Sequence, residues 1–265
     1  MPQLPRIQAF EFNDLPTIPS ALRDTIVESL SLTLRWGRVL RQAVPHFEEF
    51  LRRCGTDEVL DLCAGAAGPA RILVEEIKGA GRTPPRVVLT DLFPRLEVWG
   101  EAVAAHPQAI AIEADPVDAT AIPESLSRGR ARMVINAFHH FPPSLAQAIV
   151  TDAVRCRAGL FIAEGFSRNP LQILNLSFAG LPALFLNPLL AHRENVAKAA
   201  LTWLTPIVAG VALWDGVVST LRIHRRGDLM AMAEAAGGDY EWEYRPYRYP
   251  PLGVGHCFFG VPRRG

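Results

Sequence analysis

The sequence lacks an excess of charge of either sign, a cysteine framework and any internal repeat. Its 27 basic and 27 acidic residues give a formal charge of zero, which argues against a broad electrostatic surface for nucleic acid. The four cysteines (Cys54, Cys63, Cys156 and Cys257) form no C-x-x-C pair and no metal-ligand spacing. The opening stretch MPQLPRIQAFEFND has neither the basic nor the apolar region of a signal peptide. We therefore expect a cytoplasmic protein with no metal site and no nucleic-acid partner.

Short apolar runs separated by helical patterns occupy the middle of the chain. The runs are EVLDLC, RVVLTDL, AIAIEAD, RMVINAF and GLFIAEG. Apolar strands that alternate with helices are typical of a parallel sheet covered on both faces, so the pattern predicts an α/β doubly wound fold. Near the C-terminus, DYEWEYR and HCFFGV leave no room for a helix between them. We expect these two runs to pair as an antiparallel hairpin.

Helical patterns precede and interrupt this core. Residues 20–35 carry one apolar stripe with Ser20 as the expected N-cap, and a second pattern ends near Gly55. Residues 169–222 include NPLQILNLSFAGLPALFLNPLLAH, which contains no charged residue. Pro182 and Pro188 are expected to break a helix there, which argues against a membrane span. We predict instead an apolar cap, with a peripheral membrane contact or a dimer contact as alternatives.

The stretch VLDLCAGAAGP resembles a strand that turns on glycines into a helix, the usual place for a nucleotide-like ligand. Cys63, Gly65 and Gly68 match a degraded dinucleotide fingerprint, whereas Asp61, Cys63, Gly65 and Ala67 match a degraded acidic-x-G-x-G-x-G motif. The loop alone does not choose between them. Asp61 at the strand end suits a cationic amino group, and the same charge would repel a pyrophosphate.

Two further acidic residues follow the next two strands. Asp91 ends the second strand, where it can accept hydrogen bonds from ribose hydroxyls, and Asp118 lies in DPVDATAIP after the third, where it can accept from an adenine amino group. Three carboxylates at the ends of successive strands suit a ligand with an amine, a ribose, an adenine and a positive sulfonium. That ligand is S-adenosylmethionine.

With these motifs, the sequence resembles the class I S-adenosylmethionine-dependent methyltransferases over residues 55–165 and 226–261, and VINAFHHF resembles the small-molecule branch, similar to quinone-biosynthesis methyltransferases. The resemblance implies a seven-stranded Rossmann-like sheet whose last strand is antiparallel. It also implies a set of cofactor-binding residues: Asp61, Cys63, Ala64 and Gly65 for the methionine part, Asp91 and Leu92 for the ribose, Asp118 and Ala119 for the adenine, and Asn136. Cys63 and Ala67 depart from the usual glycines. The fourth strand lacks the N-P-P-Y ending that suggests methylation of a planar nitrogen.

The predicted catalytic residues lie at the ends of the fourth and fifth strands. His139 or His140 can take a proton from a hydroxyl or amine, and Glu164 can orient the substrate or accept a proton. The alternatives are hydrogen bonds to nearby backbone for the histidines and a turn cap for Glu164. Arg222 is a candidate clamp for an acidic substrate group, with an ion pair to Asp215 or a helix cap as the alternative.

The sequence thus predicts four segments and one leading function. The segments are an N-terminal helical cap (1–54), a cofactor-binding core (55–168), an apolar helical insertion (169–222) and a C-terminal completion of the sheet (223–265). The leading hypothesis is an enzyme that transfers a methyl group from S-adenosylmethionine to an O, N or C nucleophile of a small, lipophilic metabolite. The alternatives are an NAD(P)-dependent oxidoreductase, a non-methylating enzyme that binds S-adenosylmethionine and a membrane-surface protein.

Overall fold

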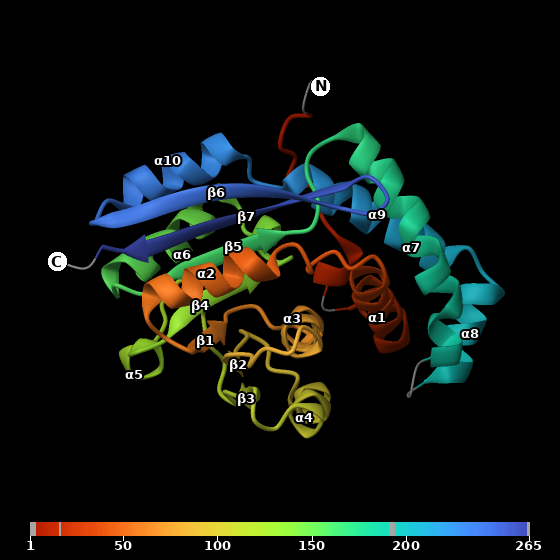
Figure 1. The fold of residues 1–265 in the computed structure, drawn as a ribbon. Helices are drawn as coiled ribbons and strands as arrows, with labels where there is room; N and C mark the ends of the chain where they lie inside the picture. The colour runs from red at the N-terminus through yellow and green to blue at the C-terminus, as the bar shows by residue number, and fades with distance from the viewer. Residues whose placement is uncertain (1–3, 16, 191–193, 264–265) are drawn as a thin grey trace.

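One mixed sheet forms the centre of the protein, with helices on both of its faces (Figure 1). The computed structural model describes residues 4–15, 17–190 and 194–263. The strand order is β3-β2-β1-β4-β5-β7-β6. The strands are β1 (Glu58–Asp61), β2 (Arg86–Leu89), β3 (Ile110–Ile112), β4 (Ala131–Ile135), β5 (Leu160–Glu164), β6 (Tyr240–Tyr249) and β7 (Gly253–Pro262).

The first five strands are parallel, and β7 lies antiparallel between β5 and β6. In this register Ile162 of β5 pairs with Phe258, and Trp242 of β6 pairs with Gly260. A hairpin needs no crossover helix, so the last two strands can fill an edge that a parallel connection could not reach with so few residues. The predicted doubly wound sheet and its antiparallel last strand are both confirmed.

Each central strand alternates its side chains between two apolar cores. Val59, Met133 and Phe161 belong to the core under α2, α3 and α4, whereas Leu60 and Val134 belong to the core under α6 and α10. Burial of both faces explains why these strands are continuous apolar runs in the sequence. The covering helices are α2 (Val44–Cys54), α3 (Gly68–Gly79), α4 (Leu96–Ala105), α5 (Glu124–Ser127), α6 (Pro143–Arg155) and α10 (Arg226–Ala236).

A second group of helices stands at one end of the sheet (Figure 1). These helices are α1 (Ser20–Trp36), α7 (Pro170–Leu190), α8 (Asn195–Trp203) and α9 (Ile207–Arg222). A small apolar cluster that includes Leu22, Leu184 and Val208 joins α1, α7 and α9. The N-terminal helix and the insertion after β5 therefore pack on each other, although the chain separates them by the whole parallel sheet.

Two local predictions are wrong. Pro182 and Pro188 do not end the helix, because α7 runs through both of them. A proline removes one backbone hydrogen bond, and the tertiary packing of α7 against α1, α8 and α9 maintains the helix despite that loss. Ser20 is the first helical residue and not the N-cap; its hydroxyl hydrogen-bonds Glu194 instead.

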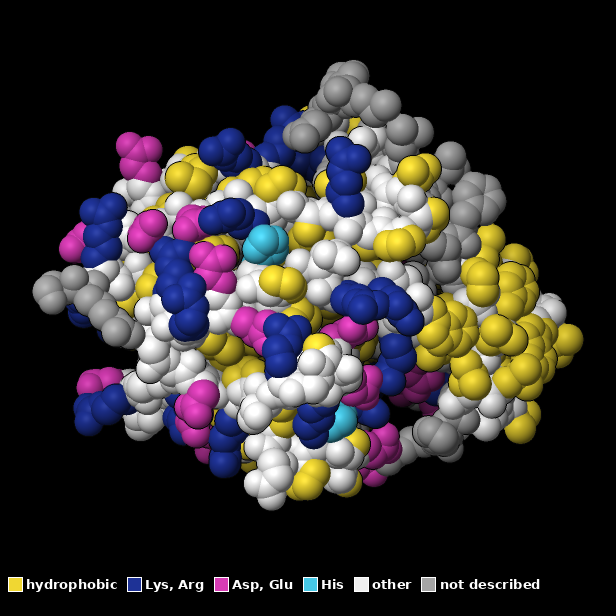
Figure 2. Space-filling view, in the orientation of Figure 1, with side chains coloured by type: hydrophobic (Ala, Val, Ile, Leu, Met, Phe, Trp, Pro, Cys, Tyr) yellow, Lys and Arg dark blue, Asp and Glu magenta, His cyan; other side chains and the backbone are white. Residues whose placement is uncertain are grey.

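The outer side of the helical insertion is apolar. Figure 2 shows a dense group of hydrophobic side chains on this end of the molecule. It includes Leu189 at 67% exposed, Leu204 at 82% and Trp214 at 42%. None of the described helices is by itself long and apolar enough to cross a membrane, although α8 and α9, bent by 81° at their junction, meet the test of length and composition as a pair.

Candidate active site

The glycine turn after β1 is tied to the rest of the sheet by its own backbone. Gly65 has a φ of +50°; its N–H donates to Asp91 Oδ2 at 2.9 Å and its carbonyl accepts from Trp99 Nε1 at 2.8 Å. Trp99 belongs to α4 and is fully buried. The turn is therefore held in one position, and the acid that was predicted to bind ribose holds it.

Ala67 occupies the position at which the motif usually has its third glycine. Its φ of +60° lies in the left-handed region, which costs a residue with a Cβ about 1–2 kcal/mol. Its N–H nevertheless donates to Ala64 O at 2.6 Å. The departure from glycine thus keeps the shape of the turn and adds local strain.

Two carboxylates meet at this turn without a basic partner. Asp61 is 2% exposed, and burial together with the negative charge of Asp91 raises its pKa to about 7. Within the described part of the chain, neither Asp61 nor Asp91 forms an ion pair with a lysine or arginine. A buried acid that lacks a counter-charge is costly, so the site is suited to a positively charged group.

The other residues predicted to bind the cofactor lie along the same edge of the sheet. The Val117 N–H donates to Asp91 O at 2.9 Å, which brings the segment after β3 beside Asp91. Asp118 is exposed, and its Oδ1 accepts from the N–H and hydroxyl of Thr120. Asn136, with a φ of +53°, accepts the Gly165 N–H at 2.6 Å.

Asn136 also carries an unused donor. Its Nδ2 is buried and has no hydrogen-bond partner among the described residues. The predicted residues Cys63, Ala64, Leu92 and Ala119 belong to the same loops, with Ala64 N–H bonded to Thr90 O at 3.1 Å. The carboxyl ends of β1, β2 and β4 therefore offer acceptors and one free donor to a single ligand, although the cofactor role of each residue stays a prediction.

His139 and Glu164 form a buried pair at the ends of β4 and β5. His139 Nδ1 lies 3.0 and 3.1 Å from the two carboxylate oxygens of Glu164, and the His139 backbone N–H donates to Oε1 at 2.9 Å. The side chains are 3% and 2% exposed. Burial raises the pKa of Glu164 to about 7 and lowers that of His139 to about 3.

The consequence is a neutral imidazole of defined tautomer. Since the carboxylate already accepts a backbone N–H, we assign the imidazole proton to Nδ1, where it bonds Glu164. Nε2 of His139 then carries no proton and can accept one. His139 follows β4 and Glu164 ends β5, and their catalytic role stays a prediction.

His140 faces acids from the N-terminal segment. Its Nδ1 lies 3.1 Å from Asp14 Oδ1 and 3.8 Å from Glu11 Oε2, and its ring lies 4.4 Å from that of His139. Although burial opposes ionisation of Asp14, hydrogen bonds from His140 and Arg222 lower its pKa to about 2. His140 is therefore engaged in a charged cluster, which separates its environment from that of His139.

Arg222 belongs to the same cluster. Its guanidinium pairs with Glu11 at 2.9 Å and Asp14 at 2.8 Å and donates through Nε to Ala9 O at 2.9 Å. The predicted alternative of a pair between Arg222 and Asp215 is wrong, because Asp215 accepts the backbone N–H groups of residues 12 and 13. The Arg222 guanidinium thus binds groups of the protein itself, and its role as a clamp for an acidic substrate group stays a prediction.

No sequence pattern pointed to the acids of the N-terminal segment. Glu11 is 2% exposed and accepts a hydrogen bond from the Ser219 hydroxyl at 2.9 Å, a contact across 208 residues of sequence that no periodicity reveals. Glu11, His139 and His140 also bring ligand-type atoms within 4.8 Å of one another. Because the Arg222 guanidinium already neutralises Glu11, we assign no metal to this group.

Comparison with known proteins identifies the fold. No protein-family model matches the sequence, and no curated protein sequence matches it. Among solved structures, an O-methyltransferase family protein from Burkholderia thailandensis aligns over 92% of this chain with a TM-score of 0.52 and 13% identity. Human N-acetylserotonin methyltransferase in complex with SAM aligns over 92% with a TM-score of 0.51 and 12% identity. At these identities the likeness is one of fold alone.

The compared proteins are longer than this chain. The alignments cover 60% of the Burkholderia protein and 57% of the human enzyme, so the chain spans less than two thirds of their length. The narrower resemblance to quinone-biosynthesis methyltransferases stays a prediction.

Proposed function

We propose that the protein is a methyltransferase that uses S-adenosylmethionine and modifies a small molecule. The observation that carries the proposal is the pair of carboxylates, Asp61 and Asp91, which meets at the glycine turn without a basic partner. A dinucleotide would place its pyrophosphate beside this turn, where two negative charges oppose it. A ligand with an ammonium and a ribose satisfies both acids, and the matching fold adds to the case.

The residues around the glycine turn fit this cofactor. Asp61 would accept hydrogen bonds from the ammonium group, and Asp91 retains acceptor capacity for ribose hydroxyls while it holds the Gly65 N–H. The buried Nδ2 of Asn136 has no acceptor among the described residues, so it can donate a hydrogen bond to the ligand. When bound, S-adenosylmethionine would supply the methyl group of its sulfonium to a nucleophile, with S-adenosylhomocysteine as the leaving group.

His139 is the residue that we assign to the acceptor's proton. Its Nε2 carries no proton because Glu164 holds the proton of the ring on Nδ1, and a nucleophile with an O–H or N–H would transfer its proton to this atom as the new bond forms. Glu164 is a positioning residue in this scheme, since it acts through the imidazole. Acceptors with an oxygen or nitrogen nucleophile are favoured over carbon on this ground.

The lipophilic character of the acceptor rests on the helical insertion. Exposed apolar side chains cover its outer side (Figure 2), and α9 packs on the turn η2 (Phe138–His140) that carries both histidines. An apolar molecule that packs on α9 beside this turn would be close to His139. We therefore retain a small lipophilic metabolite as the proposed acceptor class.

Isothermal titration with S-adenosylhomocysteine and with NAD(H) tests the cofactor assignment. We expect S-adenosylhomocysteine to bind and NAD(H) not to bind. Asp91→Asn should weaken the first by about tenfold or more, because it removes a charge-assisted acceptor, whereas Asp57→Asn, at an exposed site before β1, should leave it unchanged. NAD(H) binding without S-adenosylhomocysteine binding would overturn the proposal.

The type of reaction is tested separately. The protein is incubated with S-adenosylmethionine and a panel of phenols, catechols and amines of increasing apolar size, and the products are separated by chromatography. Formation of S-adenosylhomocysteine indicates methyl transfer, whereas methylthioadenosine indicates displacement within the cofactor. Acceptance of small polar members alone would overturn the lipophilic class.

A further inference from the structure

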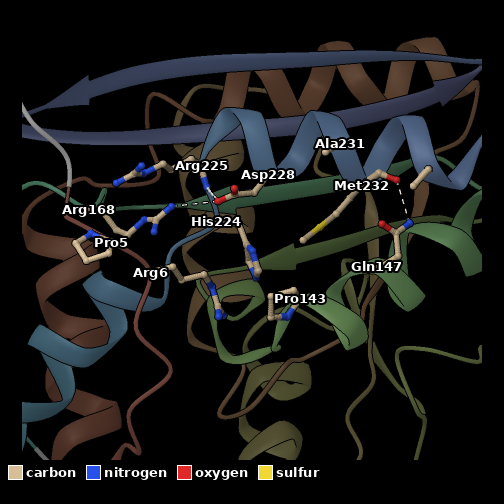
Figure 3. Close-up of a pocket in the computed structure, with 11 residues that line it drawn as sticks. Pro5, Arg6, Pro143, Gln147, Arg168, His224, Arg225, Asp228, Ala231 and Met232 are labelled. Atoms are coloured by element: carbon tan, nitrogen blue, oxygen red, sulfur yellow. Dashed lines mark hydrogen bonds and ion pairs between the residues drawn. The ribbon is translucent and has the colours of Figure 1, made fainter.

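A pocket lies beside the segment that carries His139, because Arg6 in its wall reaches the backbone oxygen of that residue. It has a volume of about 620 Å³ and lies between the N-terminal segment, the loop after β5 and the first turns of α6 and α10. None of the predicted cofactor-binding or catalytic residues lines it. Figure 3 shows Arg6, Arg168 and Arg225 on one side of it and Met232 and Pro143 on another.

The pocket carries an uncompensated positive charge. Three arginines line it (Arg6, Arg168 and Arg225), whereas Asp228 is the one acidic residue in its wall. Arg168 is 3% exposed and pairs with Asp228 at 3.1 Å, and the same carboxylate accepts the Arg225 backbone N–H at 2.8 Å. The carboxylate therefore forms an ion pair with one of the three guanidinium groups, that of Arg168, and a net positive charge remains.

Burial and mutual repulsion act on these cations. Burial and the charge of Arg225 lower the pKa of Arg168, and burial and the charge of Arg222 lower that of Arg6. Arginine stays protonated in proteins, so the cost appears as destabilisation that a bound anion would relieve.

Two buried guanidinium nitrogens at this pocket have no hydrogen-bond partner among the described residues. They are Nε of Arg168 and Nε of Arg225. Nε2 of His224 lies 3.0 Å from Phe141 O and donates to it, so Nδ1 of this neutral ring is an acceptor. Buried polar atoms are nearly always hydrogen-bonded, so the two arginine nitrogens indicate acceptor oxygens that a ligand would bring.

The guanidinium groups are held in place before any ligand arrives. Arg6 donates through Nε to Arg222 O at 2.8 Å and through Nη2 to Phe141 O at 3.0 Å. Arg225 donates through Nη2 to Leu4 O. Side chains that are already ordered lose little entropy on binding, and guanidinium groups match carboxylate and phosphate oxygens in geometry.

We propose that this pocket binds a small organic anion, with its carboxylate or phosphate group against Arg168 and Arg225 and its apolar part against Met232 and Pro143. The lining agrees with a ligand that is charged at one end and apolar at the other. Met232 is 7% exposed, and Ala231 and Ala235 extend the apolar side. Arg6 also reaches His139 O at 3.4 Å, so the ligand would lie one side chain away from the segment that carries His139.

The probes are benzoate, phenyl phosphate and neutral benzamide, measured by isothermal titration with the full chain and no other ligand. We expect at least one anion to bind and benzamide not to bind; the tighter anion identifies a carboxylate or a phosphate as the natural group. Arg168→Gln and Arg225→Gln should each weaken that anion by about tenfold or more. Arg128→Gln, at an exposed site on α5, is the matched control.

Arg225→Gln keeps the test sharp if Arg168→Gln fails to fold, since Arg225 is only partly buried. Absence of binding by both anions, equal binding of benzamide, or unchanged affinity in a folded variant would overturn the proposal. Because S-adenosylhomocysteine is absent from these titrations, their outcome is independent of the proposed methyl transfer.

Discussion

Ionisation of Asp61 should make cofactor binding depend on pH near neutrality. Burial and the charge of Asp91 raise the pKa of Asp61 from 3.8 to about 7. Below that value the carboxyl is protonated and cannot neutralise the ammonium group of the ligand. If only the ionised form binds, the apparent dissociation constant equals the intrinsic constant divided by the ionised fraction. That fraction rises from about one tenth near pH 6 to about three quarters near pH 7.5, so affinity should rise about eightfold.

The assay is isothermal titration of S-adenosylhomocysteine at several values between about pH 6 and about pH 7.5, the window that the pKa of about 7 defines. Asp61→Asn is nearly isosteric and should bind weakly with no such slope, whereas Asp57→Asn should keep the wild-type slope. Glu164 also has a pKa of about 7, so Glu164→Gln serves as a second control that should keep it.

The same shift has a consequence for stability with a definite sign. Asp61 binds its proton more tightly in the folded state, so its contribution to stability is present below the ordinary pKa of 3.8 and is lost as the pH rises through about 7. Asp61→Asn should therefore gain in melting temperature relative to wild type as the pH rises. A pH-independent affinity in the wild type, or an unchanged slope in Asp61→Asn, would refute the reasoning.

Three further predictions concern the pair at β4 and β5 and the core. Glu164→Gln should lower the turnover number by about 10²–10⁴ with little change in cofactor affinity, because an amide no longer directs the imidazole proton of His139; steady-state kinetics and titration separate the two quantities, and an equal loss in both would contradict it. Arg132→Met should reduce the free energy of unfolding by about 1.5–3 kcal/mol, because it removes the 2.7 Å charge-assisted bond to Asp152, whose carboxylate keeps Arg155 and the Ile122 N–H as partners; urea denaturation measures this. Gly255→Ala should cost about 1–3 kcal/mol in the same assay, since a Cβ there would lie 2.6 Å from the backbone oxygen of Glu164.

The sheet could be predicted from the sequence because its physics is local and periodic. A strand such as β5 (Leu160–Glu164), buried on both faces, must be apolar throughout, and turn residues mark its ends. The final hairpin followed from the lack of room for a helix. Helix boundaries were less accessible: α7 continues through Pro182 because other helices pack on it, and local propensity carries no information about that packing.

The candidate site divides in the same way. Asp61, Asp91 and Glu164 could be placed at one edge because the carboxyl ends of parallel strands share an edge. The contacts of the N-terminal acids could not be predicted. Glu11 and Ser219, for example, are 208 residues apart in the sequence. The pairing of Arg222 with the N-terminal acids and not with Asp215 has the same cause.

These pairings decide what the acids along the edge of the sheet can do. Glu11 and Asp14 face the guanidinium of Arg222, so their charges are neutralised within the protein. Asp61 and Asp91 have no such partner in the described part of the chain, and burial raises the pKa of Asp61 instead. The formal charge of the whole chain is zero, yet its charges are unevenly distributed. The site of Asp61 and Asp91 is suited to a cation, whereas the pocket of Arg6, Arg168 and Arg225 is suited to an anion. Arg6 in the wall of this pocket reaches His139 O at 3.4 Å, so the proposed proton acceptor adjoins the site for the anion.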